Sequence, residues 1–452
     1  MSEKRSSFTG KIGFILAAAG SAVGLGNIWR FPYLAAKYGG GIFLLVYVLL
    51  ALTFGFALMC AEIAIGRKTG KSAIGAFHDL NKKYTFIGVL ASAVPIIILP
   101  YYAVIGGWVT KYITVFVSGQ GAAAADGSYF GGFVSQSVEP LVFFLIFMAV
   151  TALIVLFGVE KGIEKVSKFM MPLLVVMTIG IVIYVLCQPG IGAGVKAYLV
   201  PDFASITATS LTKTILGAMG QLFYSMSLAM GIMITYGSYM KKEDHIEKSV
   251  HQIELFDTGI AILAGLMIVP AATVFGGGIE KPGPGLMFSA LPVVFDKMPG
   301  GHIVGAVFFI LVLFAALTSS ISLMETIVSI FCDKFGWNRK VTCLVVFLGC
   351  LALGVPSSLG FGLWSHILPL GMDLLTFFDF ISNSVMMPIV ALLTCLFIGF
   401  VIKPVTLVEE IEQSGRFKLK KLFTVVIKYV APICIVLILI SSVLDAFGLF
   451  KI

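Results

Sequence analysis

The chain has 452 residues and a formal net charge of +8; 59% of its residues are hydrophobic and only 12% are charged. Because a soluble protein usually has about 25% charged residues, this composition excludes an ordinary soluble enzyme or binding module. It predicts a polytopic membrane protein.

Eleven apolar segments, each long enough to cross a bilayer, follow one another between charged or Gly/Pro-rich turns. They cover residues 11–36, 40–66, 87–118, 139–158, 166–187, 208–240, 249–276, 301–332, 341–356, 369–400 and 422–447. The first run is too long for a cleavable signal peptide and lacks a small-residue cleavage site. We therefore expect an all-α protein with eleven transmembrane helices in a lipid bilayer.

Most of the 31 lysines and arginines fall in alternate loops that are cytoplasmic if the N-terminus is cytoplasmic. The clusters are Lys4/Arg5/Lys11, Arg67/Lys68/Lys71/Lys82/Lys83, Lys161/Lys165/Lys168, Lys241/Lys242/Lys248, Lys334/Arg339/Lys340 and Lys403/Arg416/Lys418/Lys420/Lys421. This is the positive-inside pattern of a membrane protein, so we expect no nucleic-acid partner. Eleven spans then place the C-terminus outside.

The first span is interrupted at mid-membrane depth. Residues 20–32 read GSAVGLGNIWRFP, with three glycines, an amide, an arginine and a proline. Irregular backbone survives inside a bilayer only where it is buried in protein or lines a cavity. This segment is therefore a candidate binding site.

The sixth span is interrupted in the same way, within residues 221–231, QLFYSMSLAMG. Because the sixth span starts five spans after the first and five is odd, a five-helix repeat is inverted the second time. We expect an inverted-repeat transporter with its binding site at the midplane. The expected organisation is a cytoplasmic tail 1–10, a first repeat 11–187, an external loop 188–207, a second repeat 208–400 with an external lid loop 277–300, a cytoplasmic linker 401–421, and a last span with an external C-terminus 422–452.

Oxygen-bearing residues gather near both breaks. Asn27, Ser225 and Ser227 lie beside them, and Thr318 and Ser319 lie within the eighth span. Unwound carbonyls with such side chains suit hard cations. The alternative is that each hydroxyl bonds only to its own helix.

Intramembrane ionisable residues are costly and usually face a cavity or a partner. Arg30 and Asp379 are candidates for a pair across an external vestibule, or else for unrelated interfacial charges. Asp257 has no cation nearby in sequence, so a bound metal ion would explain its charge; a protonated or helix-packing carboxyl is the alternative. The remaining three are Glu62, Glu325 and Asp373. The seven cysteines and five histidines are scattered, so we expect neither a zinc site nor an organic cofactor.

These motifs closely resemble the neurotransmitter:sodium symporter family, in its bacterial leucine-transporter-like branch, over nearly the whole chain. That family is itself a standard example of the inverted-repeat architecture. The resemblance rests on residues 20–32, Gly39-Gly40-Gly41-Ile42-Phe43, Tyr47, Glu62 to Arg67, Tyr101-Tyr102, Gln221 to Tyr239, Gly283-Pro284-Gly285-Leu286, Thr318-Ser319-Ser320 and Asp379-Phe380.

The resemblance implies two sodium sites and an amino-acid site. One sodium site would comprise Ala22, Asn27, Ser225 and Asp257; the other would comprise Gly20, Val23, Ala315, Thr318 and Ser319. The substrate carboxylate would meet the Leu25 and Gly26 amides and the Tyr102 hydroxyl, and its ammonium the carbonyls near Ala22, Tyr224 and Ser227. The side chain would meet Val23, Ile98, Ala229, Met230, Ser319 and Leu323. Arg30, Asp379, Tyr102 and Tyr224 would form the extracellular gate.

Three positions depart from the family pattern. Tyr224 stands where a gating Phe is usual, Ala229 where a Gly is common, and Asp257 where Asn is usual. We expect Ala229 to shrink the side-chain pocket. We also expect the Asp257 carboxylate to replace the chloride that animal members bind, which makes transport chloride-independent.

The leading hypothesis is a sodium-coupled importer, not an enzyme, of a neutral, aliphatic or hydrophobic L-amino acid in a bacterial plasma membrane. We expect it to function as a monomer, with a dimer as the alternative. The alternative substrates are another small amine or a β- or γ-amino acid. An ion channel, which also uses carbonyl-lined breaks, is a remote alternative.

Overall fold

The computed structural model describes residues 7–276 and 283–446. Within these ranges the chain is helical and contains no strand. The α-helices are α1 (Lys11–Ala22), α2 (Phe31–Lys37), α3 (Gly41–Leu50), α4 (Phe56–Thr69), α5 (Ala73–Leu80), α6 (Thr85–Val117), α7 (Gly121–Ala124), α8 (Tyr129–Val134), α9 (Glu139–Leu156), α10 (Lys165–Leu186), α11 (Gly192–Leu199), α12 (Ala208–Ser225), α13 (Ile232–Gly237), α14 (Ile246–Phe275), α15 (Leu291–Lys297), α16 (Gly301–Phe335), α17 (Arg339–Leu359), α18 (Leu374–Asp379), α19 (Met387–Leu396), α20 (Val405–Glu412), α21 (Lys420–Val425) and α22 (Ala431–Ala446).

Short π-helical turns join several of these helices into longer rods. The turns that matter below are η1 (Gly26–Arg30), η2 (Ala51–Gly55), η4 (Val159–Glu164), η6 (Leu286–Ala290) and η8 (Phe380–Met386). Such turns are rare and frequently mark functional sites. One of them, η1, belongs to the first broken span.

Nine helical rods of the described residues are long and apolar enough to cross a membrane. They run over Gly41–Thr69, Lys82–Val117, Glu139–Leu156, Val159–Leu186, Ile246–Phe275, Gly301–Phe335, Arg339–Leu359, Leu374–Ile402 and Lys420–Asp445. A tenth span results if α1 and the helix Gly26–Lys37 are counted together. The predicted span 208–240 is divided between α12 and α13 and is not among them, so the count of eleven stays a prediction.

Both predicted breaks are present. At the first, α1 ends at Ala22, Val23 is extended with φ −75° and ψ 94°, and helix resumes at Gly26 after a bend of 53°. At the second, the chain leaves helix between Ser225 and Ile232. In this gap Ser227 and Ala229 take φ values of +53° and +61°, a left-handed conformation that costs a non-glycine residue about 1–2 kcal/mol.

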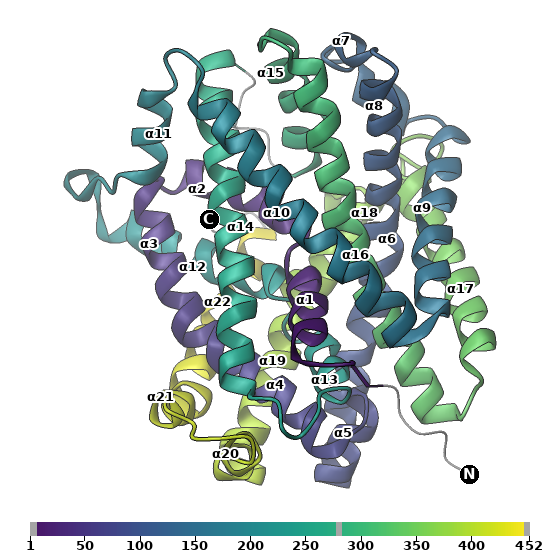
Figure 1. Cartoon of the computed structure of the whole chain (residues 1–452), viewed down its shortest axis with the longest axis vertical. Helices are drawn as coiled ribbons and strands as arrows, with labels where there is room; N and C mark the ends of the chain where they lie inside the picture. The colour runs from purple at the N-terminus through teal and green to yellow at the C-terminus, as the bar shows by residue number, and fades with distance from the viewer. Residues whose placement is uncertain (1–6, 277–282, 447–452) are drawn as a thin grey trace.

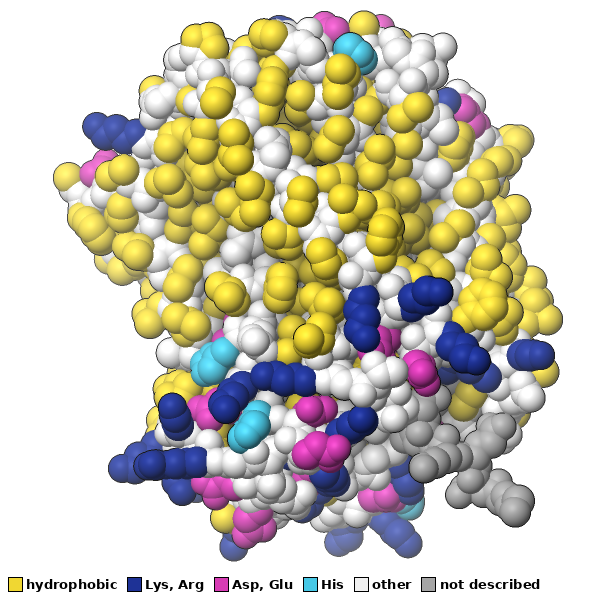
Figure 2. Space-filling model, viewed as in Figure 1, with side chains coloured by type: hydrophobic (Ala, Val, Ile, Leu, Met, Phe, Trp, Pro, Cys, Tyr) yellow, Lys and Arg dark blue, Asp and Glu magenta, His cyan; other side chains and the backbone are white. Residues whose placement is uncertain are grey.

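The two breaks lie at the centre of the bundle (Figure 1), where α1 packs against α14, α16 and α10. The long helix α6 packs against α16 and α9 and forms the other wall. In Figure 2, hydrophobic side chains cover the upper and middle part of the visible face, while lysines and arginines gather toward the lower end. The helices α5, α20 and α21 lie at that lower end (Figure 1), which we call the basic end. An apolar band beside a basic end is the distribution expected of a membrane protein.

Two predicted connecting segments hold helices of their own. Of the predicted lid loop 277–300, residues 277–282 lie outside the described residues, and the remainder contains η6 and α15. The predicted linker 401–421 contains α20. This helix is fixed to α4 because the Arg67 Nε donates to the Glu410 Oε1 at 2.8 Å, and both side chains are almost fully buried.

Candidate binding site at the two helix breaks

A buried carboxylate connects the two breaks. Asp257 on α14 has no solvent-exposed surface. Its Oδ1 accepts hydrogen bonds from the Asn27 Nδ2 at 2.7 Å and from the Ser225 Oγ at 2.7 Å. Its Oδ2 accepts one from the Tyr47 hydroxyl at 3.3 Å. Three of the four residues predicted for the first sodium site, Asn27, Ser225 and Asp257, are therefore in direct contact.

Every partner of this carboxylate is neutral. No lysine, arginine or histidine of the described residues forms an ion pair with Asp257. An isolated buried charge is expensive unless a counter-charge or several hydrogen bonds compensate it. Carboxylate, hydroxyl, amide and unwound carbonyl oxygens are ligands that suit a hard cation. The donor set thus fits a monovalent cation such as sodium.

The fourth residue predicted for this site, Ala22, lines the same small cavity as Asn27 and Ser225. The Asn27 amide oxygen accepts a hydrogen bond from the Gly24 N–H at 3.0 Å, and its nitrogen faces Asp257. An amide oriented in this way binds the carboxylate itself. To coordinate a cation beside Asp257, the Asn27 amide has to rotate about its last torsion.

The predicted second sodium site lies where α1 ends against α16. The Ser319 hydroxyl is a donor whose Oγ lies 3.3 Å from the carbonyl oxygen of Gly20 and 3.4 Å from that of Val23. The Thr318 Oγ1 donates within its own helix, to the carbonyls of Phe314 at 2.9 Å and Ala315 at 3.1 Å, and the Gly20 backbone packs against the Thr318 side chain. All five predicted residues therefore lie at this contact. The hydroxyl of Ser319 lies among the carbonyls freed by the end of α1, where a cation would also be coordinated.

Most of the residues predicted for the substrate enclose one small cavity, which we call the inner cavity and which has a volume of about 30 Å³. It is lined by Ala22, Leu25, Gly26, Ile98, Tyr102, Tyr224, Ser227, Met230, Ser319 and Leu323, together with Ser21, Gly24, Asn27, Ser225 and Ile232. The predicted residues Val23 and Ala229 are buried next to it but do not line it. Its volume is far below the ~300–1,000 Å³ of an open ligand pocket, so the helices are closed around this position.

The Leu25 amide and the Tyr102 hydroxyl, two of the predicted carboxylate-binding groups, face each other. The Leu25 N–H donates to the Tyr102 Oη at 3.3 Å. Tyr102 comes from the middle of α6, and Leu25 lies just before η1. An anion placed at the end of the break would take the place of the Tyr102 oxygen as acceptor for the Leu25 N–H, and the positive pole of the resumed helix would add to the attraction.

A second buried carboxylate holds the break between α12 and α13. The Glu62 Oε1 accepts a hydrogen bond from the Ala229 N–H at 2.7 Å, and Glu62 is 3% exposed. Its other oxygen has no hydrogen-bond partner among the described residues. This contact fixes Ala229 in its left-handed conformation next to Met230, which lines the inner cavity.

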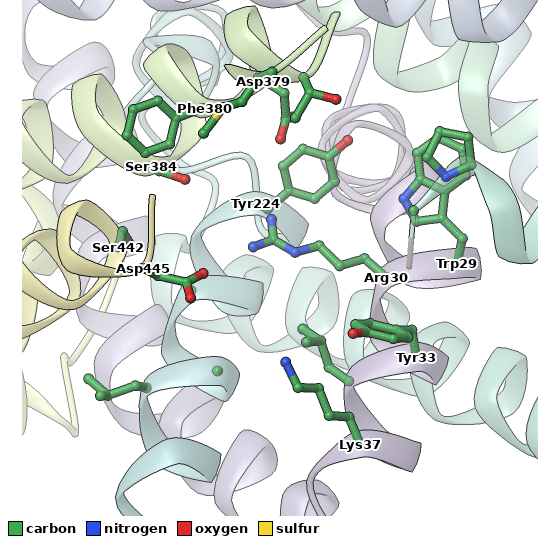
Figure 3. A pocket seen from close by; sticks show the side chains of 18 of the residues that line it. Trp29, Arg30, Tyr33, Lys37, Tyr224, Asp379, Phe380, Ser384, Ser442 and Asp445 are labelled. Atoms are coloured by element: carbon green, nitrogen blue, oxygen red, sulfur yellow. The ribbon is translucent and has the colours of Figure 1, made fainter. Parts of the chain in front are cut away.

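The Tyr224 ring separates the inner cavity from a larger one of about 500 Å³, which we call the vestibule, and it lines both. The ring lies against Gly26, where any Cβ would overlap it, so glycine is required there for close approach. The Arg30 guanidinium lies 5.4 Å from the ring centre on the vestibule side (Figure 3). The ring and the guanidinium together close the passage between the two cavities.

Arg30 and Asp379 both line the vestibule, but the described residues show no direct ion pair between them. The Asp379 Oδ1 instead accepts from the Tyr101 hydroxyl at 3.2 Å and from the Asn383 Nδ2 at 2.6 Å. In Figure 3 Arg30 lies on the far side of the Tyr224 ring from Asp379. The role of this pair as a gate stays a prediction.

Four further residues form hydrogen bonds within the candidate site, although the sequence analysis gave them no role there. The Ser21 carbonyl accepts from both Ser227 at 2.9 Å and Ser319 at 3.1 Å, which links the two breaks to α16. The Gln221 Nε2 donates to the Gly26 carbonyl at 3.0 Å. Tyr47 and Asn383 hold Asp257 and Asp379. Ser21, Tyr47 and Gln221 belong to the motifs that carry the family resemblance, and Asn383 lies four residues after Asp379 on one helical rod.

The chain matches a family model described as "Sodium:neurotransmitter symporter family" over residues 5–122 and 135–449. It is 36% identical over 451 residues to the uncharacterised sodium-dependent transporter YhdH of Bacillus subtilis, covering 98% of this chain and 99% of that protein. It is 24% identical to the sodium- and chloride-dependent taurine transporter of Homo sapiens, covering 92% of this chain and 74% of the relative.

A solved structure has the same fold. The crystal structure of MhsT in complex with L-phenylalanine matches with a TM-score of 0.88 and 38% sequence identity. The match covers 97% of this chain and 100% of that one. The arrangement of helices described above is therefore that of MhsT.

Proposed function

Because the chain belongs to the sodium:neurotransmitter symporter family, we propose that it imports a neutral, hydrophobic L-amino acid together with sodium, by alternating access. The observation that carries the proposal is the Asp257 carboxylate, buried at both helix breaks among neutral donors. It attracts a cation to a position beside the inner cavity. Membership of this family favours a symporter over the alternatives of a channel or an enzyme.

The groups around the inner cavity support an α-amino acid as the substrate. The Leu25 and Gly26 amides and the Tyr102 hydroxyl would bind its carboxylate, and the carbonyls near Ala22, Tyr224 and Ser227 its ammonium. The side chain would lie among Ile98, Met230 and Leu323, which are apolar. MhsT, a similar protein, was crystallised with L-phenylalanine.

Two sodium ions per cycle are part of the proposal. The first would be held by Ala22, Asn27, Ser225 and Asp257. The second would be held by the carbonyls of Gly20, Val23 and Ala315 with the hydroxyls of Thr318 and Ser319. The support for the second site is that the Ser319 hydroxyl already lies among these carbonyls.

Transport is proposed to be chloride-independent. The similar animal transporters are named sodium- and chloride-dependent. In this chain the Asp257 carboxylate lies against Ser225 and Tyr47 and would supply a fixed negative charge within the first sodium site. A fixed anion would make a bound chloride unnecessary.

The basic end is proposed to face the cytoplasm, which places the vestibule and Asp379 outside, with an internal N-terminus and an external C-terminus. The concentration of lysine and arginine at one end (Figure 2) supports this orientation. The proposed location is the plasma membrane of a bacterium, with the monomer as the transporting unit.

The decisive experiment measures binding of each of the twenty standard amino acids, with taurine and 4-aminobutyrate added, to purified protein in sodium or in potassium chloride. We expect a hydrophobic L-amino acid to bind at least about tenfold more tightly in sodium. Tighter binding of taurine or 4-aminobutyrate would select the β- or γ-amino-acid alternative. Equal binding in the two salts for every compound would reject sodium coupling. Replacing chloride by gluconate tests chloride independence, which a loss of binding would contradict.

A further inference from the structure

Two further titratable residues lie on α14 before Asp257: Glu254 about one helical turn away and His251 nearly two turns away. Glu254 is 2% exposed, and its Oε2 lies 3.2 Å from the Nδ1 of His251. The Glu254 Oε1 is buried and has no hydrogen-bond partner in the described part of the chain. No role in the proposed transport cycle uses either residue.

The charge of this glutamate is only partly compensated. Among residues 7–276 and 283–446, no lysine or arginine forms an ion pair with Glu254. Its one polar partner, His251, is 41% exposed in its side chain and can exchange protons with water. A buried carboxylate with one unpartnered oxygen beside an imidazole offers two neighbouring groups that can share a proton.

The surroundings of His251 fix its position. Its ring stacks on Phe56 of α4 at 4.7 Å between centroids, and Phe56 in turn contacts Phe417 of the segment after α20 at 6.3 Å. This packing places His251 near the basic end and Glu254 deeper in the bundle, toward Asp257.

The other charged groups around the pair are few. Those that interact with it electrostatically are Glu247 and Asp257 on α14 and Cys60 on α4. The turn η2 carries no titratable side chain, Lys11 of α1 interacts with Asp244, and Lys165 and Lys168 of α10 are exposed. The nearest strong charge on the inner side of Glu254 is therefore that of Asp257.

We propose that Glu254 and His251 form a proton-binding site whose occupancy opposes sodium binding at Asp257. The inference rests on the proposed first sodium site. The pair carries a charge of −1 with neutral histidine and ionised glutamate, and it becomes neutral when one proton binds to it. The proton comes from water at the exposed edge of His251 and returns there, and it belongs to the pair as a unit.

The sign of the coupling follows from electrostatics. A sodium ion beside Asp257 is attracted by the negative pair one turn away, and protonation removes this attraction. By linkage, sodium binding must then release a proton. The proton-bound pair favours the sodium-free protein, so acid on the side of the basic end would speed release of sodium there.

The test measures binding of radiolabelled sodium to the purified protein at about pH 8 and about pH 6, the range in which histidine titrates. For the wild-type protein we expect the half-saturating sodium concentration to rise at least about fivefold on acidification. Glu254→Gln should bind sodium weakly at both pH values, as the acidified wild type does. His251→Gln should change the pH at which sodium binding weakens, because the proton then binds to the Glu254 carboxylate alone.

The matched controls are Glu243→Gln in the loop before α14 and His302→Gln at the start of α16, two exposed residues outside the pair. Both should keep the wild-type pH response. A second readout is proton release on sodium addition, followed with a pH-indicator dye in weakly buffered protein; Glu254→Gln should abolish it. Retained sodium binding at saturating sodium shows that each variant is folded.

The outcomes separate the two proposals. If sodium binds to none of these proteins at either pH, the proposed sodium site is wrong. If sodium binds but Glu254→Gln and His251→Gln show the same pH shift as the wild-type protein, only the proton-binding site is wrong.

Discussion

The Glu62 carboxylate on α4 accepts a hydrogen bond of 2.7 Å from the backbone N–H of Ala229, in the middle of the break between α12 and α13. Ala229, the donor, has a backbone φ of +61°, which residues with a Cβ atom normally avoid. A side chain from one helix thus holds the strained backbone of another at the wall of the inner cavity.

We predict that Glu62→Ala lowers the stability of the protein by about 1–3 kcal/mol, because the Ala229 N–H is left buried without a partner. Glu62→Gln retains an oxygen that can accept this hydrogen bond, so it should lose less stability. The measurement is the thermal unfolding midpoint of the purified variants. Equal midpoints for the two variants would show that the hydrogen bond does not stabilise the break.

Ala229→Gly should have two separate effects. It relieves a left-handed alanine, which costs about 1 kcal/mol, so the unfolding midpoint should rise or stay unchanged. It also removes a methyl group beside Met230, and relative affinity for L-tryptophan over L-leucine should increase by about tenfold. The first effect needs no assumption about the substrate.

Gly231→Ala is the matched control for this change. Gly231 has a φ of +74° two residues further on, and the substitution should lower the unfolding midpoint because alanine is strained in that conformation. A lower midpoint for Ala229→Gly, or a higher one for Gly231→Ala, would contradict the interpretation of this break.

We predict that the Tyr224 ring slows substrate exit because its bulk blocks the passage between the inner cavity and the vestibule, and that its hydroxyl contributes little. Tyr224→Phe keeps the face that packs on Gly26 and under Arg30, whereas Tyr224→Ala opens the inner cavity to the vestibule. We expect Tyr224→Ala to speed dissociation of bound substrate by at least about tenfold, since loss of an aromatic lid and its cation–π contact removes about 1–2 kcal/mol. Tyr224→Phe should stay within about threefold of the wild type.

Gly26→Ala tests the same packing from the other side. Its new Cβ overlaps the Tyr224 ring, so the single variant should bind substrate poorly, and Tyr224→Ala should partly restore binding to it. Losses that are additive in the double variant would argue against a direct contact.

The helices could be predicted from the sequence because each bilayer-spanning segment must be apolar over its full length. The two interruptions could be predicted for the same reason, since glycine and polar residues have no place in a lipid-facing helix. The end of α12 at Ser225 and the restart at Ile232 depend on Glu62, which comes from a distant part of the chain. No local pattern encodes that contact.

Site residues were predictable where a broken span carries them and less so where they come from a regular helix. The contact of Asp257 with Asn27 and Ser225 matches the set expected from the family resemblance. The contact with Tyr47 does not follow from any spacing, because it depends on how the rod Gly41–Thr69 lies against α14. The stacking of Arg30 on Tyr224 depends on side-chain orientation, which the sequence does not determine.

The Arg67–Glu410 ion pair should matter for stability. Both side chains are at most 1% exposed, and they join α4 to α20. Breaking a buried pair by removing one partner costs about 3–5 kcal/mol, so Glu410→Gln and Arg67→Met should each lower the unfolding midpoint clearly. The double variant Arg67→Met/Glu410→Leu should recover much of the loss, because no unpaired charge remains buried.

The charge of Asp257 decides between the proposed sodium site and a purely structural role. Asp257→Asn keeps the size of the side chain and a hydrogen-bonding oxygen toward Ser225 but removes the negative charge. If a sodium ion binds there, the half-saturating sodium concentration should rise at least about tenfold, because a buried charge loses its counter-ion. Chloride should then partly restore binding, since an anion near Tyr47 and Ser225 replaces the missing carboxylate charge. Asn27→Ala, which removes an uncharged partner, should weaken sodium binding without creating a chloride effect. An Asp257→Asn protein with the sodium and chloride dependence of the wild type would show that this carboxylate only packs the helices together.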